Sequence, residues 1–165
     1  MIFHKNVPTE DRERITRALR DIKKFGDKFH RETAEFIEKN DIVVYLDLAE
    51  KVGGSGSVQL NSQRAARKAV AKGKLKVAEA ASYVRLNIAR ETIDTGGQQG
   101  IEGTFVHEGK HARDFALMLS TFSSGVEETI FNPTAFQREY SAHITAAFYL
   151  MRRGGNYAKE GINLG

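Results

Sequence analysis

The first forty residues have the hydrophobic periodicity of amphipathic helices. Apolar side chains recur at three- and four-residue steps, which places them on one face. They are Ile15, Ala18, Leu19, Ile22, Phe25, Phe29, Phe36 and Ile37. We expect Thr9 to be the N-cap of this region, with Glu10 and Asp11 in an acidic first turn. Gly26 is the position where we expect the region to divide into two helices.

Two later segments have the pattern of β-strands. Residues 41–48 are rich in β-branched and apolar side chains, which favour strands. Residues 82–89 alternate between apolar and polar positions, as in a strand with one buried face. The apolar positions of this second strand are Val84, Leu86 and Ile88.

The segments between and after these strands contain glycine and small residues. Residues 53–57 (GGSGS) predict a flexible loop, and residues 58–60 predict a short strand. The Ala- and Lys-rich residues 61–81 predict helix in part, interrupted at Gly73. Residues 95–100 predict a second loop.

Two long helices are expected in the last third of the chain. The first covers about residues 101–120 and is broken at Ser123-Ser124-Gly125. The second begins at Asn132-Pro133, an N-cap followed by proline at the first helical position. It extends to Arg152-Arg153, and we expect Gly154-Gly155 to end it.

Together these elements predict an α+β protein with a small mixed or antiparallel sheet packed on several helices. The chain has 165 residues, enough for a single domain over 1–165 with a helical N-terminal region at 1–40. No run approaches the 18 or so apolar residues of a membrane span, and MIFHKNVPTEDRER lacks the apolar stretch of a signal peptide. We therefore expect a cytoplasmic protein, or one exported by a signal-independent route or as part of a larger protein.

Cysteine is absent, so disulfides, thiolate zinc sites and cysteine nucleophiles are excluded. A metal site in this chain must use histidine and carboxylate ligands. The net charge of +4 is uneven, because residues 61–90 hold eight Lys or Arg against one Asp or Glu. No aromatic residue is interleaved in the basic stretch, so a solvated helix face is favoured over a nucleic-acid-binding surface. That stretch consists of Arg64, Arg67, Lys68, Lys72, Lys74 and Lys76.

Residues 107–111, His-Glu-Gly-Lys-His, form an HExxH motif inside the predicted 101–120 helix. His107 and His111 are one turn apart on the same face, so both imidazoles can bind one Zn²⁺ ion. Glu108 lies beside them and can accept a proton from water that the metal has made more acidic. The alternative is a pair of surface histidines on an amphipathic helix. The apolar stripe on the opposite face is Phe105, Gly109, Ala112, Ala116 and Leu119.

The helix that follows Asn132-Pro133 offers a third ligand. Glu139 and His143 lie one turn apart on a face that we expect to point inward. An inward carboxylate is costly unless it is paired or metal-bound, which favours Glu139 as the ligand. The alternative is a solvent-exposed Glu139, or one paired with Arg138 or Arg113. The apolar residues that continue the face are Phe136, Ala146 and Leu150.

The combination of HEGKH with a later helix reading E-x-x-A resembles the gluzincin type of zinc metallopeptidase. The resemblance covers about residues 82–152, which form the expected zinc-site core. It implies a zincin-like fold in which the HExxH helix faces a second ligand helix. It also implies that His107, His111 and Glu139 bind zinc and that Glu108 is the general base.

The chain departs from the gluzincin pattern at one position. The family usually has an Asp four residues after the ligand Glu, where this chain has His143. His143 is therefore a candidate transition-state donor, a substitute third ligand or an altered orienting residue. Asp114 can supply the missing carboxylate, and Tyr140 is a further candidate for a supporting role.

The resemblance implies that the protein hydrolyses a peptide or protein substrate. We expect the strand at Tyr83–Ile88 either to be a sheet edge that pairs with an extended peptide, or to be an ordinary interior strand. GTFVHEGKHARDF and NPTAFQREYSAH also resemble HExxH domains at the ends of bacterial polymorphic toxins, which implies an inhibitor (immunity) or carrier protein as partner. A non-catalytic zincin-like binding domain and a basic nucleic-acid-binding module are the alternatives.

Overall fold

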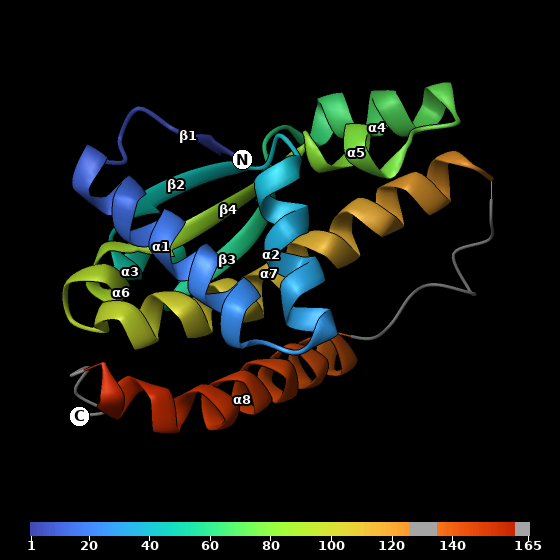
Figure 1. The fold of residues 1–165 in the computed structure, drawn as a ribbon. Coiled ribbons are helices and arrows are strands. Elements are labelled where there is room, and N and C mark those ends of the chain that lie inside the picture. The colour runs from blue at the N-terminus through green and yellow to red at the C-terminus, as the bar shows by residue number, and fades with distance from the viewer. Residues whose placement is uncertain (126–134, 161–165) are drawn as a thin grey trace.

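The computed structural model describes residues 1–125 and 135–160, and it is an α+β protein (Figure 1). In chain order its elements are β1 (Ile2–Phe3), α1 (Thr9–Phe25), α2 (Lys28–Lys39), β2 (Val43–Asp47), α3 (Ala49–Val52), β3 (Gly56–Leu60), α4 (Gln63–Lys72), α5 (Val77–Ala81), β4 (Val84–Ala89), α6 (Arg90–Asp94), α7 (Gly97–Ser123) and α8 (Ala135–Lys159). The expectation of an α+β class is therefore confirmed. Within the described residues, no helix is long and apolar enough to cross a membrane.

The four described strands form one mixed sheet in the order β1-β2-β4-β3. β1, β2 and β4 are parallel, whereas β3 runs antiparallel to β4, with Gly56 opposite Ile88 and Leu60 opposite Val84. Of the two interpretations of the Tyr83–Ile88 strand, the sheet edge is therefore wrong and the interior strand is correct, because β2 and β3 pair with its two sides. β3 is at the edge beside it.

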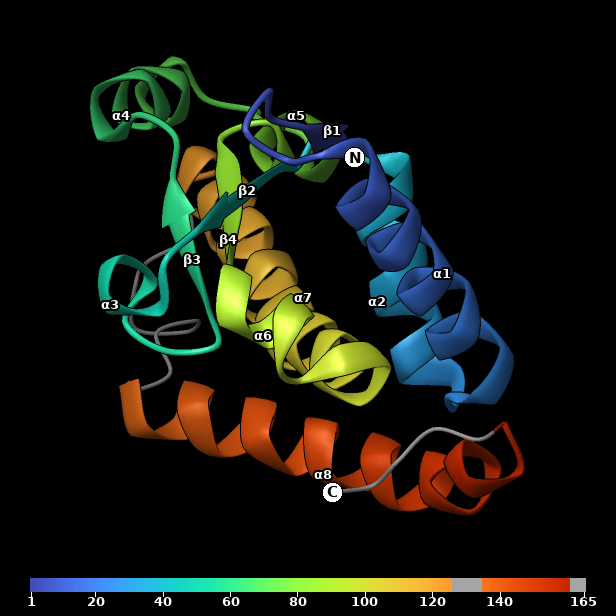
Figure 2. The same cartoon turned by 90° about the vertical axis from the view of Figure 1, so that its left-hand side faces the viewer.

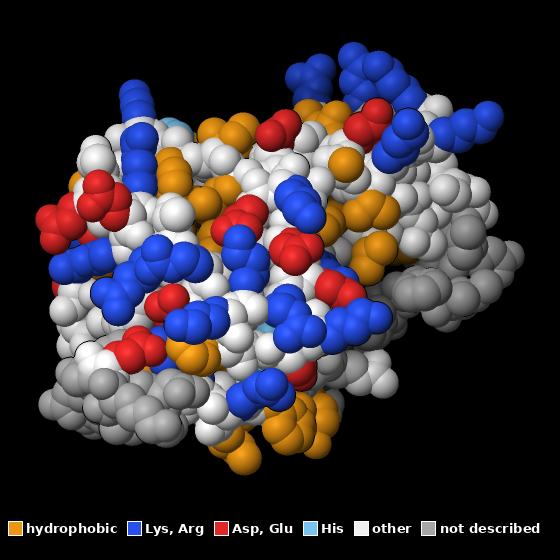
Figure 3. Space-filling view, viewed as in Figure 1, with side chains coloured by type: hydrophobic (Ala, Val, Ile, Leu, Met, Phe, Trp, Pro, Cys, Tyr) orange, Lys and Arg blue, Asp and Glu red, His pale blue; other side chains and the backbone are white. Residues whose placement is uncertain are grey.

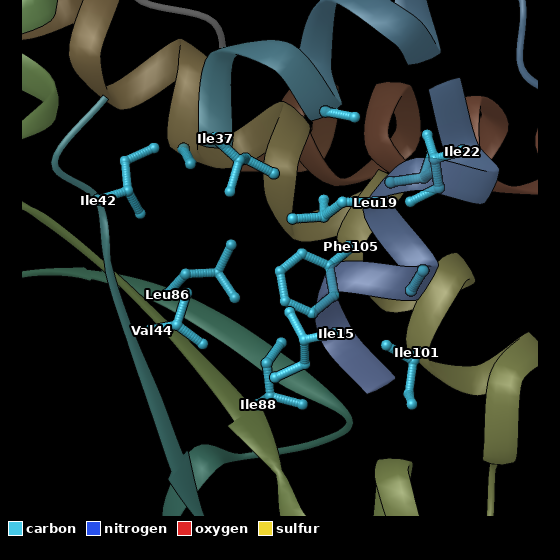
Figure 4. Packing of buried hydrophobic residues seen from close by; sticks show 14 of the residues in the cluster. Ile15, Leu19, Ile22, Ile37, Ile42, Val44, Leu86, Ile88, Ile101 and Phe105 are labelled. Carbon is cyan, nitrogen blue, oxygen red and sulfur yellow. The ribbon is translucent and has the colours of Figure 1, made fainter. Parts of the chain in front are cut away.

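The hydrophobic core lies between one face of the sheet and helices α1, α2 and α7 (Figure 4). The alternating apolar positions of β4 are fully buried, as the sequence pattern predicted. In Figure 4, Phe105 of α7 lies next to Ile15 of α1, near Leu86 and Ile88 of β4. α7 contacts the sheet, α1, α2, α5 and α8, so the HExxH helix runs through the middle of the molecule (Figure 2).

The structure confirms one of the two helix boundaries predicted in the N-terminal half and shifts the other by one residue. The division at Gly26 is confirmed, and α2 then begins with Asp27 as its N-cap, where the Asp27 carboxylate accepts from the His30 backbone N–H at 3.0 Å. The prediction that Thr9 is an N-cap is wrong by one position. Pro8 stands at the cap and Thr9 is already helical. Pro8 fixes an extended backbone there without a side-chain cap.

Three glycine-rich predictions are wrong because tertiary contacts override weak local propensity. Residues 97–100 are not a loop but the first turn of α7, where Gln98 Nε2 donates to Asp21 Oδ2 of α1 at 3.4 Å. Gly56 and Ser57 are not loop but the start of β3. α8 does not end at Gly154-Gly155 but continues to Lys159. The predicted Asn132-Pro133 helix start lies outside the described residues.

The basic stretch lies on and after α4, where its Arg and Lys side chains are all exposed. Figure 3 shows these cations gathered over α4 at the upper right of the molecule. α4 contacts α7 through its other side, and Ala66 is its buried residue. This arrangement is that of a solvated helix face.

Glu102 of α7 anchors the C-terminal half of α8. Its carboxyl group has no exposed surface and accepts hydrogen bonds from the hydroxyls of Tyr149, at 2.9 Å, and Tyr157. Mainly through burial, the pKa of both phenols is raised above its ordinary value of 10, so both hydroxyl groups keep their protons and act as donors. Arg153, also fully buried, has Nε 3.3 Å from Glu102 Oε2 and makes a bidentate pair with Glu160. Tyr157 and Arg153 explain why α8 continues past its glycines.

We predict that Arg153→Met lowers the free energy of unfolding by about 3–5 kcal/mol, because it leaves the buried Glu102 carboxyl without its cation. The measurement is equilibrium urea denaturation. The matched control is Arg152→Met, which removes an exposed arginine and its hydrogen bond to the Phe25 carbonyl. We expect the control to cost about 1 kcal/mol or less. Equal costs in the two variants would contradict the anchoring role.

Candidate metal centre

His107 and His111 face the same cavity from consecutive turns of α7. Their Nε2 atoms are 3.2 Å apart. Two donors at roughly 2.0–2.1 Å from a tetrahedral ion lie about 3.3 Å from each other. The helical spacing predicted from the sequence therefore brings the two imidazoles to the separation that one metal ion requires.

Glu139 of α8 lies opposite both histidines. Its Oε2 atom is 3.5 Å from His107 Nε2, and its Oε1 atom is 3.3 Å from His111 Nε2. These separations are again close to the edge of a tetrahedron around zinc. The two contacts use different oxygens of the carboxylate, so Glu139 lies within reach of both histidines as a candidate third ligand.

His143 lies one turn beyond Glu139 and belongs to the same cluster. Its Nε2 atom is 3.9 Å from Glu139 Oε2, and its ring centroid is 4.5 Å from that of His107. Ligand atoms lie within 4.8 Å of one another in two groups, His107-Glu139-His143 and His107-Glu108-His111. The cluster therefore offers more donors than one tetrahedral site needs, and His107 is common to both groups.

The expected inward orientation of Glu139 is wrong. The buried positions of α8 near the centre are Ala142 and Tyr149, whereas Glu139 is 57% exposed and His143 is 74% exposed. Ala146 and Leu150 are half-buried, and the side chain of Phe136 lies outside the described residues. A desolvation cost therefore does not single out Glu139 as a ligand. The short distances from Glu139 to both histidines are what make it a candidate ligand.

Glu108 is buried beneath the edge strand β3. Its Oε1 atom is 3.9 Å from His107 Nε2. Gly56 passes so close that a Cβ there would lie 2.7 Å from Glu108 Cγ and 2.7 Å from Thr104 Cγ2. Only glycine fits this crossing, so the Gly-rich segment has a steric function that its sequence alone did not disclose.

These side chains surround a cavity of about 460 Å³. One wall is the segment from Gly53 to Val58, and the other consists of α7 and α8 side chains. The α7 and α8 side chains that line it include those of the candidate metal centre, namely His107, Glu108, His111, Glu139 and His143. The predicted base and both alternatives for the third ligand therefore share one hollow.

Burial shifts the ionisation of the cluster in a direction that suits metal binding. Burial, with the neighbouring His111 and His143, lowers the pKa of His107 from 6.5 to about 4. Burial also lowers the pKa of His111. Neutral imidazole is the form that binds a metal, so protons compete weakly at both positions. Burial and then the charge of Glu139 raise the pKa of Glu108 to about 7.

The other predicted supporting residues have different surroundings. Asp114 forms an ion pair with Lys110, whose Nζ is 2.6 Å from Asp114 Oδ2. Tyr140 is 59% exposed. Arg113 donates to Thr33 Oγ1 at 2.9 Å and lies 3.8 Å from Glu32, so its pairs are on α2 and not with Glu139.

Sequence reasoning missed His30 and Glu102, both of which hold α8 in place. His30 is buried, and its Nδ1 accepts from the Asp27 backbone N–H at 3.1 Å, so Nε2 is the donor toward the Thr145 carbonyl at 3.0 Å. Thr145 is two residues after His143. The Asp-x-x-His spacing at a helix start was the available signal for a cap, but nothing in it indicated the partner on α8.

We predict that Glu108→Gln changes how the stability of the metal-free protein depends on pH. Between pH 4 and 6.5 the unfolded chain holds more protons at His107, so this histidine makes the fold more stable as pH rises. Glu108 has the opposite effect. Between pH 4.5 and 7 its carboxyl group is protonated in the folded protein and ionised in the unfolded chain, so Glu108 makes the fold less stable as pH rises. Glu108→Gln removes the opposing effect, so the variant should gain more stability than the wild type between pH 4.5 and 7.

The measurement is urea denaturation at several pH values in the presence of a chelator. Glu13→Gln, which removes an exposed carboxylate on α1, is the control and should follow the wild type. Parallel stability profiles for Glu108→Gln and the wild type would show that Glu108 does not titrate as the buried site requires.

Comparisons with known proteins add no independent indication of what this cluster does. No family model, no curated protein and no solved structure matches the chain. The resemblance to gluzincins and to toxin domains therefore stays a prediction from the sequence. The feature that points to a function is the geometry of the His107, His111 and Glu139 side chains.

Proposed function

We propose that the protein is a zinc-dependent peptidase in which His107, His111 and Glu139 hold the metal and Glu108 is the general base. The observation that carries the proposal is the set of mutual separations of 3.2 to 3.5 Å among the three donor groups. A buried carboxyl group directly beside them supports it. Three candidate metal ligands and an adjacent carboxyl group are what a zincin-like site would need.

A zinc ion held at this position would act as a Lewis acid on the substrate carbonyl and lower the pKa of bound water. Glu108 accepts the proton of the attacking water, whose oxygen forms a bond to the carbonyl carbon. Glu108 then gives this proton to the amide nitrogen, and the carbon–nitrogen bond breaks. In the metal-free protein burial raises the pKa of Glu108 to about 7, and the positive charge of a bound zinc ion would lower it toward the ionised form that accepts a proton.

The edge strand β3 provides a place for the substrate backbone. In the described sheet β3 pairs with β4 alone, and its first residues lie over Glu108 and Thr104. An extended peptide that adds to the free side of β3 would form backbone hydrogen bonds along this edge. Its scissile carbonyl would then lie close to Glu108. Peptide or protein is therefore the substrate class that we propose.

We predict that Glu139→Ala weakens zinc binding by about tenfold or more, whereas His143→Ala retains it. The double variant His107→Ala/His111→Ala should bind no zinc at this site, because it leaves too few ligands. The measurement is competition for zinc with a fluorescent chelator at neutral pH. If His143→Ala loses zinc while Glu139→Ala keeps it, the third ligand is His143.

We predict that Glu108→Gln binds zinc like the wild type but hydrolyses peptides about 10²- to 10⁴-fold more slowly, because it cannot accept the proton. Metal content and peptide cleavage are measured on the same preparations, with Glu13→Gln as the control. Loss of both zinc and activity would make Glu108 a ligand. A zinc-loaded wild type that cleaves no peptide would favour the non-catalytic binding domain.

A further inference from the structure

A second and larger cavity adjoins the metal centre. Its volume is about 790 Å³, within the range of about 300–1,000 Å³ that ligand pockets occupy. Gly54 and Ser55 line both this cavity and the cavity of the metal centre. Thr104 of α7 also lines it, four residues before Glu108, which is about 6 Å along the helix axis. The two hollows are therefore neighbours that share the loop at Gly54 and Ser55 as part of their walls.

Hydrogen bonds hold the loop between the two cavities. The Ser55 carbonyl accepts from the Ala89 backbone N–H at 2.9 Å and from the Thr92 hydroxyl at 2.8 Å. The Gly53 N–H donates to the Ala49 carbonyl at 2.8 Å. Since both ends of the loop are fixed to neighbouring elements, the larger cavity is preformed.

The α7 side of the larger cavity is kept open by residues without side chains. Gly100 and Gly103 lie one turn apart on this side. A Cβ at Gly103 would be 3.4 Å from Leu150 of α8, which lines the cavity as well. This side of the cavity is thus made partly of glycine backbone, with Leu150 facing it from α8.

Glu91 supplies the charge of the larger cavity. It is the one charged side chain among the described residues that line it, and the other lining residues are Ala, Gly, Ser, Thr, Gln and Leu. Its Oε2 atom accepts from the Ala49 backbone N–H at 2.9 Å. Within residues 1–125 and 135–160, no Lys, Arg or His side chain forms an ion pair with Glu91. Glu91 is exposed, so its carboxylate lies at the open side of the cavity, where it attracts a cation from solution.

We propose that the cavity lined by Glu91 binds a lysine or arginine side chain of the substrate, within two residues of the scissile bond. The inference depends on the proposed peptidase function, since the substrate is placed along β3 with its scissile carbonyl beside Glu108. An extended chain advances about 3.3 Å per residue, so one or two residues cover the distance from Glu108 to Thr104. The long side chain then reaches past Thr104 toward Glu91.

The test uses peptides in an alanine- and glycine-based background that carry one Lys, Arg, norleucine or Glu at each position in turn. Cleavage by the zinc-loaded protein is measured as kcat/KM, and the cleaved bond is identified by mass spectrometry. Binding is measured separately by fluorescence anisotropy with zinc-loaded Glu108→Gln. The compared variants are Glu91→Gln, which keeps an oxygen for the Ala49 N–H, and Asp94→Asn, which removes an exposed carboxylate from the same helix.

We expect Lys or Arg near the scissile bond to be preferred over norleucine by about tenfold, in both kcat/KM and binding. Glu91→Gln should abolish that preference by lowering kcat/KM for the Lys and Arg peptides, and Asp94→Asn should retain it. Cleavage that shows no basic preference, or a preference that survives in Glu91→Gln, would overturn this inference alone. A Glu91-dependent binding preference without any cleavage would support the cation-binding cavity and overturn the peptidase proposal. No preference in either assay would overturn the cavity assignment.

Discussion

Glu102 places a fully buried carboxyl group near the N-terminal end of α7, and Tyr149, Tyr157 and Arg153 of α8 converge on it. A carboxyl group in the interior is costly unless its partners satisfy it, so this contact leaves α8 little freedom to slide or rotate. The metal centre depends on that restriction. Glu139 lies on the same helix as the three partners, and its position beside His107 follows from where α8 is fixed.

Two smaller contacts complete this support. His30 of α2 reaches the Thr145 carbonyl at 3.0 Å, next to the exposed His143. Gly56 of β3 lets the edge strand cross directly over Glu108. The HExxH helix is therefore enclosed by the sheet on one side and by an anchored α8 on another. That enclosure is the cause of the lowered pKa of His107 and the raised pKa of Glu108.

Under the proposed function, the two cavities would divide the work that a peptidase must do. The smaller one holds the donors and the buried carboxyl group, and the larger one holds Glu91 in surroundings that are otherwise uncharged. The loop at Gly54 and Ser55 separates them. Chemistry and selection of a side chain would thus occur a single helical turn apart, which is the scale of neighbouring residues in an extended peptide.

The sequence by itself determined the features that depend on local periodicity. The three- and four-residue steps indicated α1 and α2, the alternation at Val84, Leu86 and Ile88 indicated the buried face of β4, and the four-residue spacing put His107 and His111 on one face. The tertiary structure decided what depends on contacts between distant segments. Helix α8 continues past Gly154-Gly155 because Arg153 and Tyr157 contact Glu102. Strand β4 is interior because β3 pairs with it. Glu139 approaches both histidines while remaining exposed. Local propensity cannot encode these outcomes, since each one depends on the position of a partner 24 to 55 residues away in the chain.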